Sequence, residues 1–283
     1  MKIAWIGTGV MGKPMALNLK KAGYDVHVFN RTAQKAFDME KDGVTAHKTI
    51  EDCVKNADFI FTIVGYPKDV QEVYHEIFKY AKKDSILLDM TTSSPTLAIT
   101  LNQKGLEKNL YLLDAPVTGG DIGAINATLS IMVGGEKEAF NKALPLLEKL
   151  GKTINYMGQT GSGQHAKLAN QAAIAGALAG VAESLSYAKE KGLDLEKMLS
   201  VLTGGSASSW QALNNGPKMI SGDNEPGFYI KHFLKDLNLI LEETNTFDPK
   251  VVKTVQEIYE KLEKAHLGDL GTQAIFEYYL TKN

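Results

Sequence analysis

Short apolar segments of strand length alternate with longer amphipathic segments of helix length from residue 2 to about residue 160. This alternation predicts β-α-β units, in which a crossover helix makes successive strands parallel. The expected strands are 2–6, 25–29, 59–64, 86–89, 110–113 and 129–133. We therefore expect an α/β fold built on a doubly wound parallel sheet.

The pattern changes after Gly163, where an alanine-rich helical segment runs from about His165 to Lys191. The segment itself carries alanine and other small residues on nearly all of its sides, so it needs packing partners in several directions. Further helices are expected at 195–202, 208–220, 232–246 and 249–265, with a last one at the end of the chain. The sequence thus predicts two domains, 1–163 and 164–283, the second all-helical and joined to the first by a long interdomain helix. Apolar surface that such helices cannot bury within one chain predicts a homodimer or homotetramer.

The first strand runs directly into Gly7-Thr8-Gly9-Val10-Met11-Gly12, and a helix follows. In such a loop the first glycine makes the tight turn, the second lets the backbone approach a pyrophosphate, and the third packs helix against strand. A strand before the pattern and a helix after it make the prediction specific for a Rossmann-type dinucleotide site. The residues expected to bind the cofactor here are Gly7, Gly9, Val10, Met11 and Gly12.

The residues at the end of the second strand determine which dinucleotide binds in this fold, and here they are Asn30-Arg31-Thr32. An NAD enzyme usually places an acidic residue there to bind the ribose hydroxyls. Arg31 instead offers a planar donor fork suited to a 2′-phosphate, with Asn30 and Thr32 as further donors. The sequence therefore predicts NADP(H) as the cofactor.

Ligands of open α/β sheets lie beyond the carboxyl ends of the strands. Val64, Gly65 and Tyr66 stand at the carboxyl end of the third expected strand and should line the cofactor. The hydroxyl-bearing run 91–93, which includes Thr92, follows the fourth, and the segment 114–120 follows the fifth. Consecutive backbone N–H groups at Thr118, Gly119 and Gly120 would form an anion nest for a carboxylate.

Lys167 stands near the start of the long helix, and Asn170 follows one turn later on the same face. Reduction by a nicotinamide leaves negative charge on a carbonyl oxygen, so a cationic acid placed beside that oxygen lowers the barrier. The pair predicts a proton-transfer site.

Four segments together resemble the β-hydroxyacid dehydrogenases, a family that includes 3-hydroxyisobutyrate dehydrogenase, tartronate semialdehyde reductase and the glyoxylate/succinic semialdehyde reductases. They are residues 7–12, 114–120, 161–170 and 235–237, in the order of the family, and the resemblance covers essentially the full length. It implies hydride transfer between a nicotinamide and a small 3-hydroxyacid, semialdehyde or 2-oxoacid.

The resemblance also implies roles for single residues. Lys167 would donate or accept the substrate proton, and Asn170 would orient the lysine and bind substrate. The substrate carboxylate would bind at Thr118, Gly119 and Gly120. The remaining residues are Phe228 and Asp236 on the substrate side, and Thr92 and Lys235 on the cofactor side. Thr118 replaces the serine of many members, which keeps the hydroxyl and adds a methyl.

Two other readings stay open from the sequence. Imine reductases share the architecture but usually lack the lysine at position 167. A non-catalytic NADP-sensing module would tend to lose this lysine and to gain binding segments, and the chain shows neither feature.

The formal net charge of −2 leaves no broad basic field, so we do not expect nucleic-acid binding. The apolar run 172–182 is too short to cross a bilayer, so we expect a cytoplasmic protein without membrane contact. The scattered histidines and the single Cys53 set no metal-ligand spacing. Cys53 has no helper for a reactive thiol and is expected to be inert.

Overall fold

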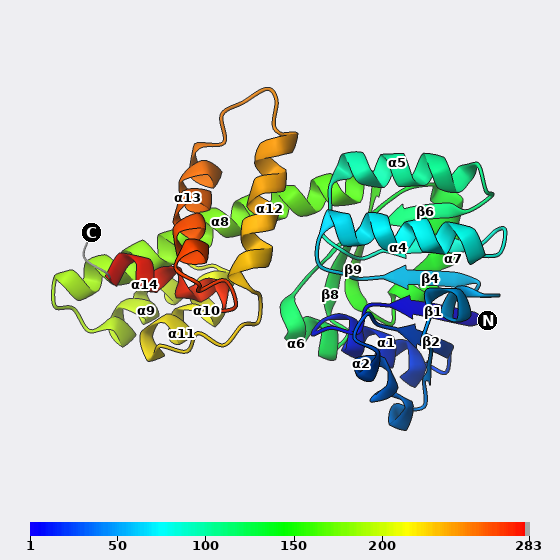
Figure 1. The fold of residues 1–283 in the computed structure, drawn as a ribbon. Helices are drawn as coiled ribbons and strands as arrows, with labels where there is room; N and C mark the ends of the chain where they lie inside the picture. Colours follow the sequence, from blue (N-terminus) through cyan, green and yellow to red (C-terminus); the bar gives the residue numbers. More distant parts are fainter. Residues whose placement is uncertain (281–283) are drawn as a thin grey trace. The chain divides into compact units, whose positions relative to one another are not determined.

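The computed structural model of the protein describes residues 1–280. The chain divides into two compact units, Met1–Lys167 and the chain from Leu168 onward. The first unit combines helices with a β-sheet, and the second is built of helices (Figure 1). The boundary between them falls within one long helix, α8 (Ser162–Glu190).

The first unit contains a nine-stranded sheet of order β3-β2-β1-β4-β5-β6-β8-β7, with β9 paired to β8. Its strands are β1 (Lys2–Ile6), β2 (Asp25–Phe29), β3 (Thr45–Ala46), β4 (Phe59–Thr62), β5 (Ile86–Asp89), β6 (Tyr111–Asp114), β7 (Val117–Thr118), β8 (Leu129–Gly134) and β9 (Gly151–Gly158). Strands β1, β2, β4, β5 and β6 pair in parallel, as the sequence predicted, and β3, which was not expected, pairs in parallel with β2. In contrast, β8 runs antiparallel to β6 and β7 and parallel to β9.

The order of the strands reverses beside β1, because β2 and β4 pair to its two sides. Such a reversal opens a crevice beyond the carboxyl ends of the strands, where ligands of this fold class bind. The carboxyl ends of β1, β4, β5 and β6 lie at one edge of the sheet, because these strands are parallel.

Helices cover both faces of the sheet, which explains why the strands read as continuous apolar runs. Ile3 and Trp5 belong to one core, and Ala4 and Ile6 to the other. The helices of the first core are α1 (Gly12–Lys21), α2 (Ala33–Phe37), α6 (Gly120–Ile125) and α7 (Lys137–Leu147). Those of the second are α3 (Ile50–Val54), α4 (Pro67–Tyr80) and α5 (Pro95–Leu106). Cys53 of α3 is buried, which raises the pKa of its thiol to about 12 and keeps it protonated near neutral pH.

The second unit is helical throughout the described residues and packs around a core from α8 and the helices that follow. They are α9 (Leu195–Gly204), α10 (Trp210–Asn214), α11 (Gly216–Ser221), α12 (Ile230–Glu243), α13 (Lys250–Lys264) and α14 (Ile275–Leu280). The described residues also include two short 3₁₀ helices, Glu40–Asp42 in the first unit and Thr272–Ala274 in the second. The helix expected at 208–220 is two helices, because Gly216 and Pro217 start a new one after Asn215.

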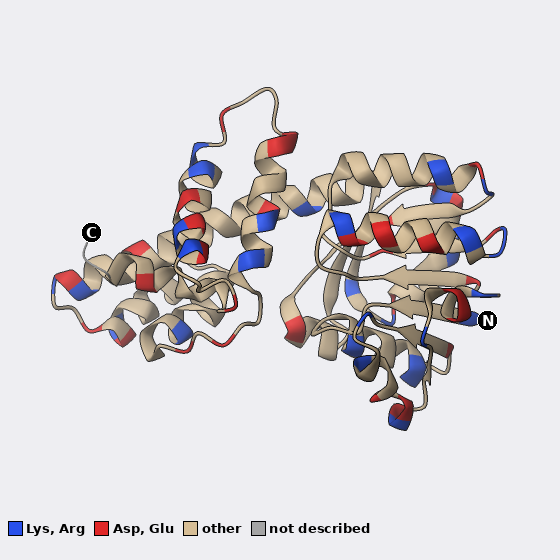
Figure 2. Ribbon diagram, viewed as in Figure 1, with Lys and Arg blue, Asp and Glu red and all other residues tan. Residues whose placement is uncertain are grey.

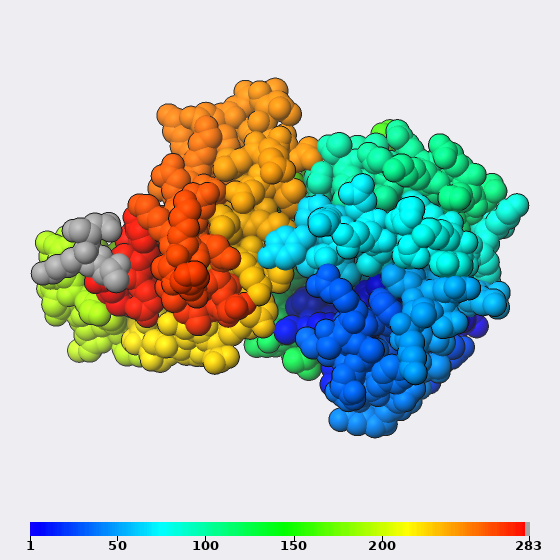
Figure 3. All heavy atoms as spheres, in the orientation of Figure 1, coloured from blue at the N-terminus to red at the C-terminus, as the bar shows by residue number. Residues whose placement is uncertain are grey.

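Charges of both signs are interspersed along α4 and α13 (Figure 2). The connection between α12 and α13 lies at the surface of the second unit (Figures 1 and 3), and its Phe247 is exposed. No helix within residues 1–280 combines the length and the apolar character needed to cross a membrane.

Candidate active site

The three glycines of the loop after β1 have different surroundings. Gly7 has a φ of +98°, and a Cβ there would lie 2.0 Å from the carbonyl oxygen of Ile63. A Cβ on Gly12 would lie 2.0 Å from the carbonyl oxygen of Gly7, so only glycine lets α1 start this close to the loop. A Cβ on Gly9 would meet nothing within 4 Å. The space beside Gly9 is therefore open to a ligand.

The loop fits the pyrophosphate of a dinucleotide in charge and in hydrogen-bonding capacity. The first turn of α1 contains no acidic residue, so its amino end favours an anion. The hydroxyl of Thr8 is buried, and its Oγ1 has no hydrogen-bond partner among residues 1–280. A buried hydroxyl normally has a partner, and a bound phosphate oxygen would supply one. Val10 is exposed and Met11 is half-buried beside the loop.

Asn30 connects the end of β2 to the glycine loop. Its Oδ1 accepts from the backbone N–H of Thr8 at 2.9 Å, and its Nδ2 donates to the carbonyl of Thr32 at 3.0 Å. Both ends of the amide are thus engaged with backbone. Sequence reasoning expected Asn30 to be a phosphate donor and missed this structural role.

Arg31 extends from the same strand end with its side chain 86% exposed. Its Nη1 lies 3.0 Å from Oδ1 of Asp69, in the first turn of α4. The other oxygen of Asp69 accepts from the backbone N–H of Tyr66 at 3.0 Å. Asp69 therefore ties the end of β2 to the segment after β4, two places where cofactor contacts were expected.

Buried polar groups connect the ends of β4 and β5. Oδ1 of Asp89 accepts from the hydroxyl of Thr62 at 3.0 Å and from the backbone N–H of Thr91 at 3.1 Å. The Thr91 hydroxyl oxygen in turn accepts from the backbone N–H of Val64 at 3.0 Å. Burial of Asp89 raises its pKa to about 6 against the opposing effect of these hydrogen bonds. Thr92, the residue expected to bind the cofactor, follows directly and is half-buried.

The segment expected to bind a carboxylate, Thr118 to Gly120, comes after β6. Thr118 ends β7 and is half-buried, and α6 begins at Gly120. Gly119 and Gly120 have φ values of +128° and +67°, which a residue with a side chain rarely adopts. A Cβ on Gly120 would meet nothing within 4 Å, so the backbone there is open to a ligand.

The start of α8 is anchored to the sheet by Asp114, the last residue of β6. Its carboxylate oxygens accept from the backbone N–H groups of Gly161 and Gln164, both at 2.8 Å. Burial raises the pKa of Asp114 to about 6, while these hydrogen bonds act in the opposite direction. Gly163 is required at this contact, because a Cβ would lie 2.4 Å from the carbonyl oxygen of Asp114.

Gln164 makes a second attachment, to the segment after β5. Its Oε1 accepts from the backbone N–H of Ser93 at 2.9 Å, and its Nε2 donates to the carbonyl of Thr91 at 2.7 Å. Lys167 lies three residues further along α8 and is 6% exposed. Sequence reasoning found the lysine but missed both residues that anchor its helix.

In the second unit, four polar side chains from α8 and α12 form a connected set. Nζ of Lys235 lies 3.1 Å from Oδ1 of Asp236, with the side chains 11% and 1% exposed. The other carboxylate oxygen of Asp236 accepts from Nε2 of Gln171 at 2.7 Å, and Oε1 of Gln171 accepts from Nδ2 of Asn170 at 3.2 Å. The structure thus brings together three expected residues, Asn170, Lys235 and Asp236, through Gln171, which was not expected.

Phe228, the last expected residue, is half-buried in the same unit. Its ring packs edge-on against Phe233, with 5.9 Å between the ring centroids. This contact belongs to the core of the second unit.

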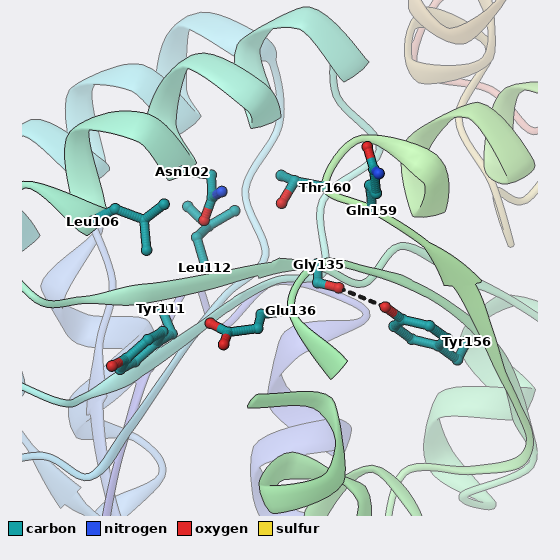
Figure 4. A pocket seen from close by; sticks show the side chains of 9 residues that line it. All are labelled: Asn102, Leu106, Tyr111, Leu112, Gly135, Glu136, Tyr156, Gln159 and Thr160. Atoms are coloured by element: carbon teal, nitrogen blue, oxygen red, sulfur yellow. Dashed lines mark hydrogen bonds between the residues drawn. The ribbon is translucent and has the colours of Figure 1, made fainter. Parts of the chain in front are cut away.

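A cavity of about 370 Å³ opens in the first unit beside β6 and β9 (Figure 4). It is lined by Asn102, Leu106, Tyr111, Leu112, Gly135, Glu136, Tyr156, Gln159 and Thr160. None of the expected site residues is among them, so we do not assign the cavity to cofactor or substrate.

Comparison with known proteins agrees with this geometry. Residues 2–158 match the model for the NAD binding domain of 6-phosphogluconate dehydrogenase. Residues 161–279 match the model described as NAD-binding of NADP-dependent 3-hydroxyisobutyrate dehydrogenase. The two matches together span both compact units.

Full-length relatives and solved structures extend the comparison. The chain is 45% identical to an uncharacterized oxidoreductase of Bacillus subtilis, over 98% of each chain. It is 38% identical to 2-hydroxy-3-oxopropionate reductase of Escherichia coli, over 86% of this chain and 84% of that one.

Among solved structures, 3-hydroxyisobutyrate dehydrogenase of Mycobacterium tuberculosis with L-serine superposes with a TM-score of 0.87, at 29% identity over 98% of both chains. The protein Psf3 in complex with NADP⁺ and 2-OPP gives a TM-score of 0.91, at 26% identity over 97% of this chain and 99% of that one. The glycine loop, the anchored lysine helix and these matches together show that the chain belongs to the β-hydroxyacid dehydrogenase family, whose members bind NAD(P).

Proposed function

We propose that the protein is an NADP(H)-dependent oxidoreductase that transfers hydride between the nicotinamide and a small 3-hydroxyacid, semialdehyde or 2-oxoacid. The observation that carries the proposal is the burial of Lys167. This lysine lies on α8, which is anchored to the edge of the sheet where the carboxyl end of β1 and the glycine loop also lie. A lysine is seldom buried without a specific role.

Lys167 acts in this proposal as the proton donor in reduction and as the acceptor in oxidation. The nicotinamide supplies or takes up the hydride. The ammonium group of Lys167 stabilises the negative charge that develops on the substrate oxygen and then delivers a proton to it. General acid catalysis of this kind is typically worth about 10²- to 10⁴-fold in rate.

The nest at Thr118, Gly119 and Gly120 binds the substrate carboxylate in this proposal. Backbone N–H groups bind an anion with little reorganisation where the fold already holds them in place, and glycine permits the positive φ values that this segment has. The extra methyl of Thr118 narrows the pocket relative to a serine. A small carboxylate-bearing substrate is therefore the partner that we propose.

Asn170 orients the lysine and binds the substrate in this proposal, with Phe228 and Asp236 on the substrate side. The contact between Asn170 and Gln171 fixes the direction in which the Asn170 amide points. Lys235, on the cofactor side, is held by the buried carboxylate of Asp236.

The preference for NADP(H) rests on the end of β2. Arg31 stands where an NAD enzyme usually has an acidic residue, and its guanidinium is exposed enough to meet a 2′-phosphate. The related Psf3 was solved with NADP⁺. For the assembly we propose a homodimer or homotetramer, supported by exposed apolar side chains of the second unit such as Tyr187 and Val201. We also propose that it works in the cytoplasm.

The test follows nicotinamide absorbance with NADPH and NADH against glyoxylate, succinic semialdehyde, methylmalonate semialdehyde and tartronate semialdehyde. Lys167→Met should lose at least about 100-fold in kcat while it keeps NADPH binding. Lys189→Met, which changes an exposed lysine of the same helix, is the matched control and should keep full activity. Tight NADPH binding without turnover of any substrate would refute the proposal and favour an imine substrate or a sensing role.

A further inference from the structure

We propose that Gln164 is a positioning residue that sets the place of Lys167 relative to the cofactor-binding edge of the sheet. This inference rests on the proposed role of Lys167. The new element is that the position of Lys167 depends on the buried side-chain amide of Gln164, three residues earlier in α8.

Gln164 is completely buried, and its amide is a two-point clamp on the segment after β5. It accepts from the backbone N–H of Ser93 and donates to the carbonyl of Thr91. These two backbone groups are only two residues apart, and they lie 71 and 73 positions from Gln164 in the sequence. The contact is made by the side chain alone, because the backbone N–H of Gln164, in the first turn of α8, already donates to Asp114.

The clamp continues into the proposed cofactor site. Thr91, which receives the Gln164 amide, also accepts from the backbone N–H of Val64 and donates its own N–H to Asp89. Thr92, proposed to contact the cofactor, lies between the two clamped residues. One glutamine thus connects the lysine helix to the segments after β4 and β5.

Asp114 and Gln164 hold the helix in different ways. Asp114 caps backbone N–H groups of the first turn and so fixes where α8 begins on β6. Gln164 reaches sideways to the neighbouring strand end, and this second attachment fixes the rotation of the helix about its axis. Residues three apart lie on one side of a helix, about 4.5 Å apart along its axis, so Lys167 follows any rotation of Gln164.

The consequence should appear in kcat. A displacement of about 1 Å at a reacting group can cost about 100-fold in rate. We therefore expect Gln164→Met, which keeps the length and removes both hydrogen bonds, to lower kcat by about 10- to 100-fold. The KM for the substrate should change less than about threefold, because the carboxylate nest belongs to another segment.

The matched control is Gln211→Met. Gln211 is also a buried glutamine, and its Oε1 accepts from Nδ2 of Asn215 at 2.6 Å in α10. It should lower the melting temperature without lowering kcat. An independent readout uses the protein without cofactor, where amide hydrogen exchange of the peptide containing Ser93 should speed up in Gln164→Met and not in Gln211→Met.

Gln164→Glu adds a signature that general destabilisation would not give. A protonated glutamic acid can accept from Ser93 and donate to Thr91 as the amide does, whereas the carboxylate would face the carbonyl oxygen of Thr91. The ratio of its kcat to that of the wild type should approach one at low pH and fall as the side chain ionises. Asp89 and Asp114 also titrate, and the new carboxylate would be coupled to both, so the pH dependence of the ratio reports the combined ionisation of the three groups.

Wild-type kcat in Gln164→Met, or a kcat ratio for Gln164→Glu that does not change with pH, would overturn the inference. Loss of activity in Gln164→Met with equal loss in Gln211→Met would also overturn it, since a change in stability alone would then explain both. Absence of turnover in the wild type and every variant would instead refute the proposed function. The exchange experiment does not need turnover and would still report on the clamp.

Discussion

Gly9 and Gly12 allow a test of the cofactor loop, because alanine should weaken NADPH binding at position 9 and the stability of the fold at position 12. In Gly9→Ala the new methyl meets nothing within 4 Å, and the backbone does not need a positive φ there. The fold should be unaffected or slightly stabilised, by up to about 1 kcal/mol, since alanine restricts the unfolded chain. The methyl would occupy the space proposed for the pyrophosphate.

The expected cost to binding follows from the hydrogen bonds that the phosphate would lose. One charge-assisted hydrogen bond is worth about 1.5–3 kcal/mol, so the Kd for NADPH should rise by about 10- to 100-fold or more in Gly9→Ala. In Gly12→Ala the Cβ would lie 2.0 Å from a backbone oxygen, and ordinary contact begins at 3.4 Å, so 3.4 − 2.0 = 1.4 Å of backbone movement is needed. Overpacking of this kind costs about 1–3 kcal/mol or more.

The two variants are compared by NADPH fluorescence titration and by thermal denaturation without cofactor. We expect Gly9→Ala to keep the melting temperature and lose affinity, and Gly12→Ala to lower the melting temperature. If Gly9→Ala bound NADPH as tightly as the wild type, the assignment of the open space to the pyrophosphate would be wrong.

Three further predictions concern single side chains. Arg31→Asp should reverse the cofactor preference by weakening NADPH binding about 10- to 100-fold relative to NADH, and an unchanged preference in a titration of both cofactors would contradict the role of Arg31. Asp236→Ala should lower the free energy of unfolding by about 3–5 kcal/mol in urea, because it removes the carboxylate from both the amine of Lys235 and the buried amide of Gln171, and a double change with Lys235→Met should recover only part of the loss. A ring nitrogen of His27 lies 2.8 Å from one of His47, and burial is the main cause that lowers the pKa of each below 6.5. The unfolded chain therefore takes up protons at a higher pH than the folded protein does. The free energy of unfolding should fall as the pH drops below about 6.5. His47→Gln should lose less stability than the wild type between pH 7 and pH 5 in urea titrations, and parallel curves would refute this account.

The features that could be predicted from the sequence depend on short stretches of chain. The glycine loop carries a local signal, because Gly7 has a φ of +98° and a Cβ on Gly12 would meet the carbonyl oxygen of Gly7, although a Cβ on Gly7 would also meet Ile63 of the neighbouring segment. Gly216-Pro217 is also a local signal, for a helix break, although the prediction for 208–220 was a single helix. Local signals were therefore sufficient there, although one was not used.

The features that were missed depend on pairing between distant segments. Gln164 and Ser93 are 71 positions apart, and Gln171 and Asp236 are 65 apart. A buried glutamine cannot be distinguished from an exposed one by its neighbours in the sequence, so no local pattern predicts either contact. The antiparallel position of β8 was missed for a related reason, because its partner β7 is two residues long and has no periodic pattern.

The Arg31–Asp69 pair raises the question of whether the arginine is available to a phosphate, and magnitudes decide it. The guanidinium is 86% exposed, and ion pairs in such places contribute about 0–1 kcal/mol. A hydrogen bond from the same guanidinium to a phosphate is worth about 1.5–3 kcal/mol, so a 2′-phosphate would compete successfully with Asp69. Asp69 would still keep its hydrogen bond to the Tyr66 backbone, which holds the first turn of α4. The carboxylate thus orients Arg31 in the absence of a phosphate at little cost to binding one, and the proposed preference for NADP(H) is compatible with the ion pair.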